Sequence, residues 1–421
     1  MQTMRARSST ILASLFAVAC GSEETAQVRT GCTEDNAGLT VPSGFCAQIV
    51  ADSVGAARHV TAAPNGDLLI AIRRSVGENS GVLVLRDGDG DGIAETRNAF
   101  GIGGGSGIAL HDGSLYFATD SAIVRWRWPD GALEPAGAPD TIVSGLHASG
   151  GHRDKTFAIA SDGSLYVSIG APSNACQVEN RLPGSPGQDP CTLLEVSGGI
   201  WRFDATKLRQ TQTDGERWAT GTRNILAIAV DSSGQPWGIQ HGRDHLALLW
   251  RATHPIYTDE KNAENPGEEM FRLDRGADFG WPYCYHDRDL SHKVLAPEYG
   301  GDGQTQGRCA AVDTPQTTYP AHWAPNAMVF SASRTFPEKY WNGAFIAFHG
   351  SFDRAPLPQQ GFNIVFQPFR SGLPTSSWEV FAEGFGGRRP AGIAIERDGS
   401  LIVTDDRRGR VYRIRKVEPG L

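Results

Sequence analysis

The stretch FAIASDGSLYVSIG, from Phe157 to Gly170, is typical of a β-hairpin. Two short apolar runs, at 157–160 and 165–169, flank Ser-Asp-Gly at 161–163. A turn signal of this kind between alternating apolar residues predicts two antiparallel strands. This hairpin decides the fold, because it recurs along the chain.

Six segments of the chain share a turn glycine followed by an alternating strand. They read NGDLLIAIR (65–73), DGSLYFATD (112–120), DGSLYVSIG (162–170), GQPWGIQHG (234–242), NGAFIAFHG (342–350) and DGSLIVTDD (398–406). Most have an apolar run before them, and many have a third run after them. The pattern predicts an all-β fold, a six-bladed β-propeller with four-stranded antiparallel blades and loop insertions. A two-sheet sandwich would not need six similar hairpins.

Two other segments fit this architecture. The run FCAQIVAD at 45–52 lies ahead of the first hairpin, so we expect it to close the ring by completing the last blade. The segment from Arg251 to Pro320 is rich in Gly, Pro and Asp and has little periodicity. Long irregular segments on a compact scaffold are more often functional loops than defects, so we interpret it as a loop insertion.

The first residues predict export. Arg5 and Arg7 precede an apolar run at 11–19 that is too short to span a bilayer as a mature helix. The sequence Ala-Val-Ala-Cys at 17–20 resembles a bacterial lipobox, although ordinary signal cleavage nearby is the alternative. We therefore expect an export signal at 1–19, a linker at 20–43 that is lipid-anchored at Cys20, and the propeller at 44–421. The expected location is periplasmic or anchored to the outer membrane of a bacterium.

Cysteine number and net charge limit the possible partners. With Cys20 lipidated, six of the seven cysteines remain, and an even number in an exported chain indicates disulfides. Fifteen pairings are possible, and grouping along the chain favours Cys32–Cys46, Cys176–Cys191 and Cys284–Cys309.

The formal net charge of −8 repels phosphate backbones, so nucleic acid is not an expected partner. The chain contains no CxxCH haem motif.

One face of the predicted disc collects the unusual residues. His152, Arg223 and Arg388 each lie eleven residues before the turn glycine of their hairpin. Strand geometry therefore places them at equivalent heights near the channel mouth. Each residue alone is more often a satisfied hydrogen-bonding group or half of an ion pair, but their coincidence favours a site. The same face receives a further set: Arg73, Asp120, Asn224, the 241–244 segment HGRD, His349, Arg389, Asp405 and Asp406. Several arginines with a histidine suit an anionic ligand with carboxylates.

Four segments carry a resemblance to a known family. GGHRDKTFAIASDGSLYVSIG, GTRNILAIAVDSSGQPWGIQHGRD, GADFGWPYCY and RRPAGIAIERDGSLIVTDDRRGRVYRI are together similar to the glucose/sorbosone dehydrogenase family, and most closely to its sorbosone-type branch. Members of that family are six-bladed propellers that use pyrroloquinoline quinone (PQQ) with calcium. The resemblance covers the chain from about Phe45 to its end.

The resemblance implies roles for particular residues. His152 would be the general base, and Arg223 with Asn224 would contact the quinone oxygens. Arg388 or Arg389 would pack on or pair with the cofactor, and His349 lies in the same region. The carbonyl groups of Gly242 and Arg243 would hold the calcium ion of the cofactor. Glu269 would bind a separate structural calcium, together with the carbonyl group of Phe279.

Three departures from the family pattern stand out. Ala171 replaces an aspartate that orients the catalytic histidine, and Thr222 replaces a histidine before Arg-Asn. No lysine matches the one that contacts PQQ.

Separately, Asp87, Asp89 and Asp91 resemble the first half of a calcium loop, although Glu95 comes earlier than the bidentate acid of a full EF-hand. An acidic hairpin turn explains that segment equally well.

The sequence thus predicts an exported PQQ- and calcium-dependent oxidoreductase that oxidises a sugar or a sugar-derived aldehyde or alcohol. Its electrons would leave to an external cytochrome or quinone. A propeller that has lost its cofactor and binds glycans or protein is one alternative, and a calcium-dependent lactonase or esterase is another.

Overall fold

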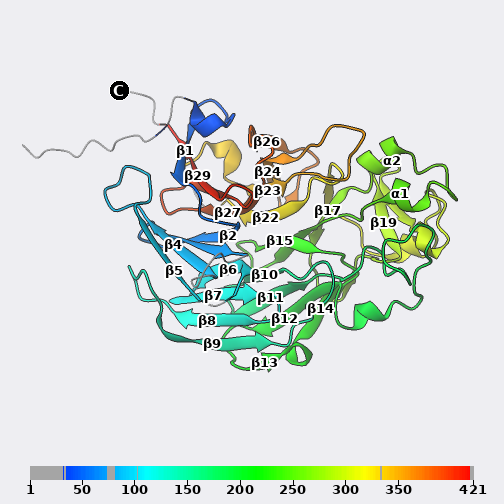
Figure 1. Ribbon diagram of the computed structural model, residues 1–421, viewed down its shortest axis with the longest axis horizontal. Coiled ribbons are helices and arrows are strands. Elements are labelled where there is room, and N and C mark those ends of the chain that lie inside the picture. The colour runs from blue at the N-terminus through cyan, green and yellow to red at the C-terminus, as the bar shows by residue number, and fades with distance from the viewer. Residues whose placement is uncertain (1–31, 33–34, 74–80, 102, 332–333, 418–421) are drawn as a thin grey trace, which may run out of the picture.

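A computed structural model describes residues 32, 35–73, 81–101, 103–331 and 334–417. Four-stranded antiparallel sheets are arranged around a central channel as six blades (Figure 1). The predicted all-β propeller is therefore confirmed. The predicted export signal and the lipid anchor at Cys20 lie outside the described residues. No helix in the described ranges is long and apolar enough to cross a membrane.

Blades 1 to 3 follow one another along the chain, and each begins with its innermost strand. Blade 1 consists of β2 (Ala57–Ala62), β3 (Leu68–Ile72), β4 (Val82–Arg86) and β5 (Thr96–Phe100). Blade 2 consists of β6 (Gly105–His111), β7 (Ser114–Thr119), β8 (Ile123–Arg127) and β9 (Ala136–Ser144), with β13 (Gln210–Thr211) added in parallel. Blade 3 consists of β10 (Lys155–Ile159), β11 (Ser164–Ile169), β12 (Gly199–Asp204) and β14 (Glu216–Thr220), with β18 (Ala277–Asp278) added in parallel.

Blades 4 to 6 complete the ring. Blade 4 consists of β15 (Ile225–Val230), β16 (Pro236–Gln240), β17 (Glu268–Arg272) and β21 (Thr317–Tyr319). Blade 5 consists of β22 (Pro325–Phe330), β23 (Gly343–His349), β24 (Phe362–Arg370) and β26 (Glu379–Ala382), with β25 (Leu373–Pro374) beside β24. Blade 6 consists of β27 (Pro390–Ile395), β28 (Leu401–Asp405), β29 (Arg410–Lys416) and β1 (Phe45–Ala51).

The ring closes as the sequence predicts. β1 pairs antiparallel with β29, so the N-terminal strand becomes the outer strand of the last blade. Phe45 of this strand packs against Phe336, Tyr340 and Phe381 of blade 5, with ring centroids 4.8, 5.7 and 5.1 Å apart. The closing strand therefore also joins blade 6 to blade 5.

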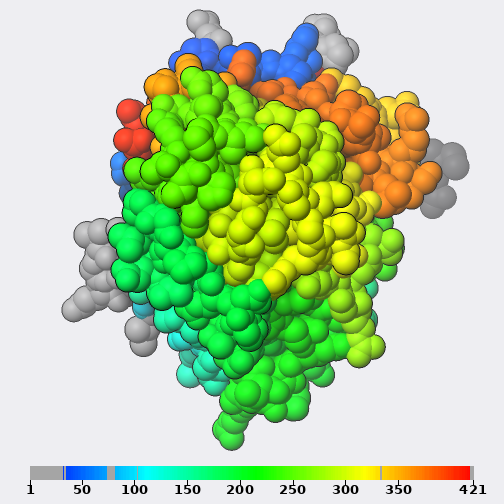
Figure 2. Space-filling view, turned by 90° about the vertical axis from the view of Figure 1, so that its right-hand side faces the viewer, coloured from blue at the N-terminus to red at the C-terminus, as the bar shows by residue number. Residues whose placement is uncertain are grey.

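The segment between β16 and β21 is more ordered than its sequence suggests. It contains β17 of blade 4, the helices α1 (Leu246–Trp250) and α2 (Asp259–Glu264), and a hairpin of β19 (Cys284–Asp287) and β20 (His292–Leu295). This insertion, light green to yellow, forms a large part of the face in Figure 2. Short 3-10 helices lie at Asn36–Gly38, Thr192–Glu195, Gln212–Asp214, Pro297–Tyr299, Gly307–Ala311 and Glu338–Tyr340.

Apolar side chains fill the interfaces between blades, and one buried cluster lies at each of the six interfaces. The predicted pairings Cys32–Cys46, Cys176–Cys191 and Cys284–Cys309 are all present as disulfides. One end of the channel forms a cavity of about 250 Å³ that all six inner strands line, mostly with apolar residues such as Ile108, Phe157, Ile228, Met328 and Ile393. Polar chemistry is therefore concentrated at the other end.

The Phe45 contacts predict how strongly ring closure stabilises the protein. Phe45→Ala should lower the free energy of unfolding by about 3–5 kcal/mol, because it leaves a cavity among buried aromatic rings. Chemical denaturation measures this change. Phe352 is 60 % exposed, so Phe352→Ala is the matched control and should change stability by less than about 0.5 kcal/mol. Equal effects of the two variants would contradict the role given to Phe45.

Candidate active site

His152 lies just before β10, and its partner follows the neighbouring strand. The Nδ1 atom of His152 lies 2.5 Å from the carbonyl oxygen of Ala171, which comes two residues after β11. A carbonyl oxygen can only accept a hydrogen bond, so Nδ1 carries the proton. The Nε2 atom of the neutral ring is then left with a free lone pair. The backbone of Ala171 thus orients the histidine, although its side chain cannot.

The His152 ring stays neutral near pH 7. Burial is the largest cause and the nearby Arg223 guanidinium the next, and together they lower the pKa of His152 to about 3. The hydrogen bond to Ala171 acts in the opposite direction but is the smaller effect. A neutral, partly buried imidazole with its tautomer fixed can accept a proton from a bound hydroxyl group.

Gly170 allows His152 and Asn224 to approach each other. A Cβ atom at position 170 would lie 2.8 Å from both Asn224 Oδ1 and His152 Cβ, closer than non-bonded atoms pack. Asn224 is buried, and its Oδ1 has no hydrogen-bond partner among the described residues. A buried polar atom of this kind calls for a partner outside the protein.

Arg223 and Arg181 share one buried carboxylate. The Nη2 atoms of both arginines lie 2.6 Å from Asp244 Oδ2. Burial opposes ionisation of Asp244, but the two guanidinium groups hold the pKa of its carboxyl well below the usual range. Arg223 Nε has no partner among the described residues. Asp244 therefore fixes the orientation of Arg223 and leaves part of the guanidinium free to meet a ligand.

A second ionic network crosses the channel mouth from blades 5 and 6 to blades 1 and 3. His349 Nε2 lies 2.9 Å from Asp406 Oδ1, and Arg58 Nη1 lies 2.6 Å from Asp406 Oδ2. Arg58 also lies 3.6 Å from Asp154, which is 3.1 Å from Arg73. Sequence analysis missed Arg58 and gave no role to Asp154. Asp154 could have been identified from the sequence, because it lies only two residues after His152.

The two candidate arginines of blade 6, Arg388 and Arg389, contact different groups. Arg389 Nη1 lies 3.0 Å from the carbonyl oxygen of Gly350 and 3.3 Å from His349 Nδ1, so this side chain belongs to the mouth. Arg388 Nη1 lies 3.2 Å from the Tyr412 hydroxyl instead. The backbone of Arg388 has the predicted height, but its long side chain turns towards a different partner.

The carbonyl oxygens of Gly242 and Arg243 are available to a cation. Neither accepts a backbone hydrogen bond within the described ranges. The Gly242 N–H donates to Glu268 Oε2 at 2.6 Å, which braces this turn, and the Arg243 guanidinium pairs with Glu298 inside the insertion. Free carbonyl oxygens suit Ca²⁺, which prefers oxygen ligands.

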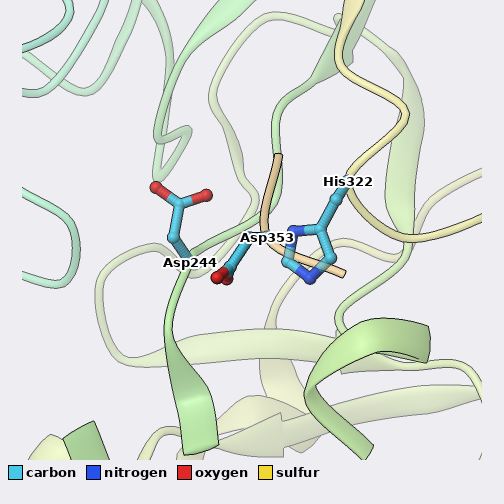
Figure 3. A group of neighbouring side chains, drawn as sticks. All are labelled: Asp244, His322 and Asp353. Atoms are coloured by element: carbon cyan, nitrogen blue, oxygen red, sulfur yellow. The ribbon is translucent and has the colours of Figure 1, made fainter. Parts of the chain in front are cut away.

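Two further groups could hold a metal ion. Asp244, His322 and Asp353 offer ligand atoms that lie within 4.8 Å of one another (Figure 3). His322 Nε2 donates to the carbonyl oxygen of Asn262 at 2.7 Å, so Nδ1 is the nitrogen with the free lone pair. Sequence analysis missed His322 and Asp353, because they lie far from Asp244 along the chain. The exposed loop of Asp87, Asp89, Asp91 and Glu95 forms a second group within the same limit.

Glu269 is already paired with a protein cation. Lys293 Nζ lies 3.0 Å from Glu269 Oε1 and donates to the carbonyl oxygen of Phe279 at 2.5 Å. Both charged side chains are almost completely buried. An ammonium group therefore lies between the two groups to which the resemblance assigned a structural calcium.

The pKa of His152 leads to a pH prediction. In the cofactor-free protein, His152 should keep its Nδ1–H tautomer at pH 5, whereas an unfolded histidine binds a proton below about 6.5. The folded state should therefore lose stability as the pH falls from about 6.5 towards 3. Nitrogen-15 NMR of the imidazole ring measures the tautomer, with the urea-unfolded protein as control. A midpoint near 6.5 in the folded protein would contradict the prediction.

The Lys293 pair leads to a stability prediction. Lys293→Met should lower the free energy of unfolding by about 3–5 kcal/mol, because it leaves the Glu269 carboxylate buried without a cation. The double variant Lys293→Met/Glu269→Gln should recover most of this loss. Chemical denaturation of both variants, with and without millimolar Ca²⁺, measures the effect. Recovery of the single variant by Ca²⁺ would show that Glu269 can bind calcium, and an unchanged single variant would contradict the pairing.

Comparison with solved structures shows a shared fold. The Trichoderma reesei carbohydrate-active enzyme of family AA12 is 19 % identical, with a TM-score of 0.74, over 90 % of this chain and 98 % of that one. The PQQ domain of Coprinopsis cinerea pyranose dehydrogenase, in its holo form, is 20 % identical, with a TM-score of 0.72, over 90 % and 97 %. The soluble aldose sugar dehydrogenase of Escherichia coli is 16 % identical, with a TM-score of 0.58, over 88 % and 99 %.

A sequence comparison adds a shorter match. A Borreliella burgdorferi protein described as uncharacterized is 35 % identical over 103 residues, which are 23 % of this chain and 26 % of that protein. The chain thus matches about a quarter of the length of that relative. The sorbosone-type branch stays a prediction. The sequence model of the TrAA12-like family matches residues 39–417, and the chain belongs to this family.

Proposed function

We propose that this protein is a sugar oxidoreductase that uses PQQ and Ca²⁺. The observation that carries the proposal is the composition of the channel mouth. Four guanidinium groups there, of Arg58, Arg73, Arg181 and Arg223, pair with the carboxylates of Asp154, Asp244 and Asp406, and a fifth, of Arg389, contacts His349. A surplus of positive charge beside a fixed neutral histidine suits an anionic cofactor with several carboxylates.

The known relatives support this cofactor. The Coprinopsis cinerea structure is a holo PQQ domain, and a calcium structure exists for the Trichoderma reesei AA12 enzyme. The residues present in this chain fit both groups. Arg223 Nε and Asn224 Oδ1 are buried atoms without partners among the described residues, and the carbonyl oxygens of Gly242 and Arg243 are free for calcium. Arg389 and His349 would also contact the cofactor.

The residues of the mouth divide the reaction between them. PQQ, when bound, would supply a quinone able to take up a hydride. His152 Nε2 accepts the proton of the substrate hydroxyl group, and the Nδ1–H bond to Ala171 keeps the ring in the orientation for that transfer. Arg223, held by Asp244, and Asn224 stabilise negative charge that develops beside them. The ion pairs of Asp244 hold Arg223 in position before substrate binds, and those of Asp406 hold Arg58 and His349.

We also propose that the protein is exported, lipid-anchored and coupled to an external electron acceptor, as the sequence predicts. Three disulfides support an exported protein, and lipidation of Cys20 would anchor it to a membrane. The chain has no haem-attachment motif, so its electrons would leave to an external cytochrome or quinone.

Reconstitution tests the proposed function. The purified mature protein should bind PQQ in the presence of Ca²⁺, as seen by the quinone absorbance, and should reduce a dye with at least one sugar of a panel. His152→Ala should lower kcat by about 10²–10⁴-fold, because proton transfer loses its acceptor, while the affinity for PQQ stays within a few-fold. His111→Ala is the matched control, since His111 ends β6 at the opposite face.

Three results would count against this proposal. A protein that binds no PQQ with Ca²⁺ would instead favour a propeller that binds glycans or protein. Full turnover in His152→Ala would remove the histidine from the mechanism. Hydrolysis of a lactone or ester by the calcium-loaded protein would favour the hydrolase alternative.

A further inference from the structure

One short loop contacts both halves of the proposed active site. It comes after β11 and comprises residues 171–176, and we call it the support loop. The carbonyl oxygen of Ala171 accepts the hydrogen bond from His152 Nδ1, and the Ala171 N–H donates to the carbonyl oxygen of Arg223 at 2.8 Å. Ala171 is completely buried. A movement of this residue would therefore displace His152 and Arg223 together.

The support loop also packs against the segment that leads to His152. The Gly151 N–H donates to the carbonyl oxygen of Pro172 at 3.2 Å. Gly150 has a φ of 69°, and a Cβ atom there would lie 2.5 Å from Pro172 Cβ, closer than non-bonded atoms pack. The two glycines before His152 thus allow its backbone to lie directly against the support loop.

Asn174 connects the support loop to the residue whose carboxylate holds Arg223. Its Nδ2 atom donates to the carbonyl oxygen of Asp244 at 2.9 Å, and its Oδ1 atom accepts from the Asp244 N–H at 3.0 Å. A side-chain amide can make both bonds because it presents a donor and an acceptor side by side. Asn174 is 1 % exposed, so bulk water does not compete for these bonds.

Trp281 and a disulfide hold the support loop from the protein interior. Trp281 Nε1 donates to the carbonyl oxygen of Asn174 at 2.9 Å. The indole also belongs to one buried cluster with Ala171 and with Cys176 and Cys191, which form a disulfide. The backbone of Asn174 is therefore fixed on one side by Trp281, while its side chain fixes Asp244 on the other.

We propose that Asn174 is a positioning residue that couples the orientation of His152 to that of Arg223. Through the support loop it keeps the Ala171 carbonyl in place for His152. Through the Asp244 backbone it keeps the carboxylate in place for Arg223. The consequence for turnover rests on the proposed function, whereas the consequence for the His152 ring and for the support loop does not.

The cofactor-free protein allows a test that does not depend on oxidation. Asn174→Ala removes both hydrogen bonds to Asp244, so the support loop should open more often. Hydrogen exchange at the Ala171 amide should become about tenfold faster, since two buried hydrogen bonds are lost. The Nδ1–H resonance of His152 in nitrogen-15 NMR should shift or broaden. Amides in β23 should keep their exchange rates, because the opening is local.

Gln210→Ala is the matched control. The buried Gln210 amide also pairs with both backbone groups of one aspartate, with Nδ2 replaced by Nε2 at 2.8 Å from the Asp204 carbonyl oxygen and Oε1 at 3.3 Å from the Asp204 nitrogen. Asp204 pairs with Ser164 beside a hairpin turn, at the face opposite the mouth. This variant should leave the Ala171 amide and the His152 resonance as in the wild type.

Trp281→Phe provides a second variant if Asn174→Ala does not fold. It keeps an aromatic ring in the cluster and removes only the bond to the Asn174 carbonyl oxygen, so exchange at the Ala171 amide should rise by about threefold. The proposal is overturned if Ala171 exchange and the His152 resonance stay unchanged in the variants, or if Gln210→Ala changes them equally.

The reconstituted enzyme gives a second readout. Asn174→Ala should lower kcat by about tenfold, because the proton acceptor is less well placed, while KM for the sugar stays within about twofold. Gln210→Ala should keep the wild-type kcat. An unchanged kcat in Asn174→Ala overturns the coupling to turnover. Changes at Ala171 and His152 in a protein that binds no PQQ would leave the role of Asn174 in orienting His152 intact and remove the proposed oxidoreductase function instead.

Discussion

The antiparallel pairing of β1 with β29 is the constraint on which the rest of the structure depends. A propeller whose first and last blades are not joined exposes strand edges and an open interface. Here the last blade takes its outer strand from the N-terminal side of the chain, and Phe45 then packs into the aromatic cluster of blade 5. Closure fixes all six inner strands around one channel, so the loops that precede them meet at one face.

At that face, the electrostatics are set by a few carboxylates that are shared between cations. Asp244 lies between Arg181 and Arg223, and Asp406 lies between Arg58 and His349. Sharing fixes the guanidinium groups while leaving them incompletely neutralised. Burial and this surplus of positive charge also keep His152 neutral. The same arrangement suits the anionic cofactor that we propose, and it keeps the His152 ring in the neutral form that the proposed proton transfer needs.

The insertion between β16 and β21 illustrates how one cation can replace another. Lys293 of the β20 strand places its ammonium group between Glu269 and the carbonyl oxygen of Phe279. A lysine of the chain thus provides the positive charge that a bound metal ion could otherwise supply. The charge of Glu269 is therefore balanced by a side chain of the protein itself.

The sequence by itself determined the strands, their blades and the face at which the unusual residues meet. Alternation of apolar residues and the spacing from each turn glycine are local properties, so they predicted one height near the channel mouth for His152, Arg223 and Arg388. Only the tertiary structure decided which groups those side chains contact. The carbonyl of Ala171 orients His152, Arg388 turns to Tyr412, and Arg58 reaches Asp406 from another blade. Such contacts depend on the path of the backbone and on the rotamers of long side chains. The alternation of apolar residues along a strand predicts neither.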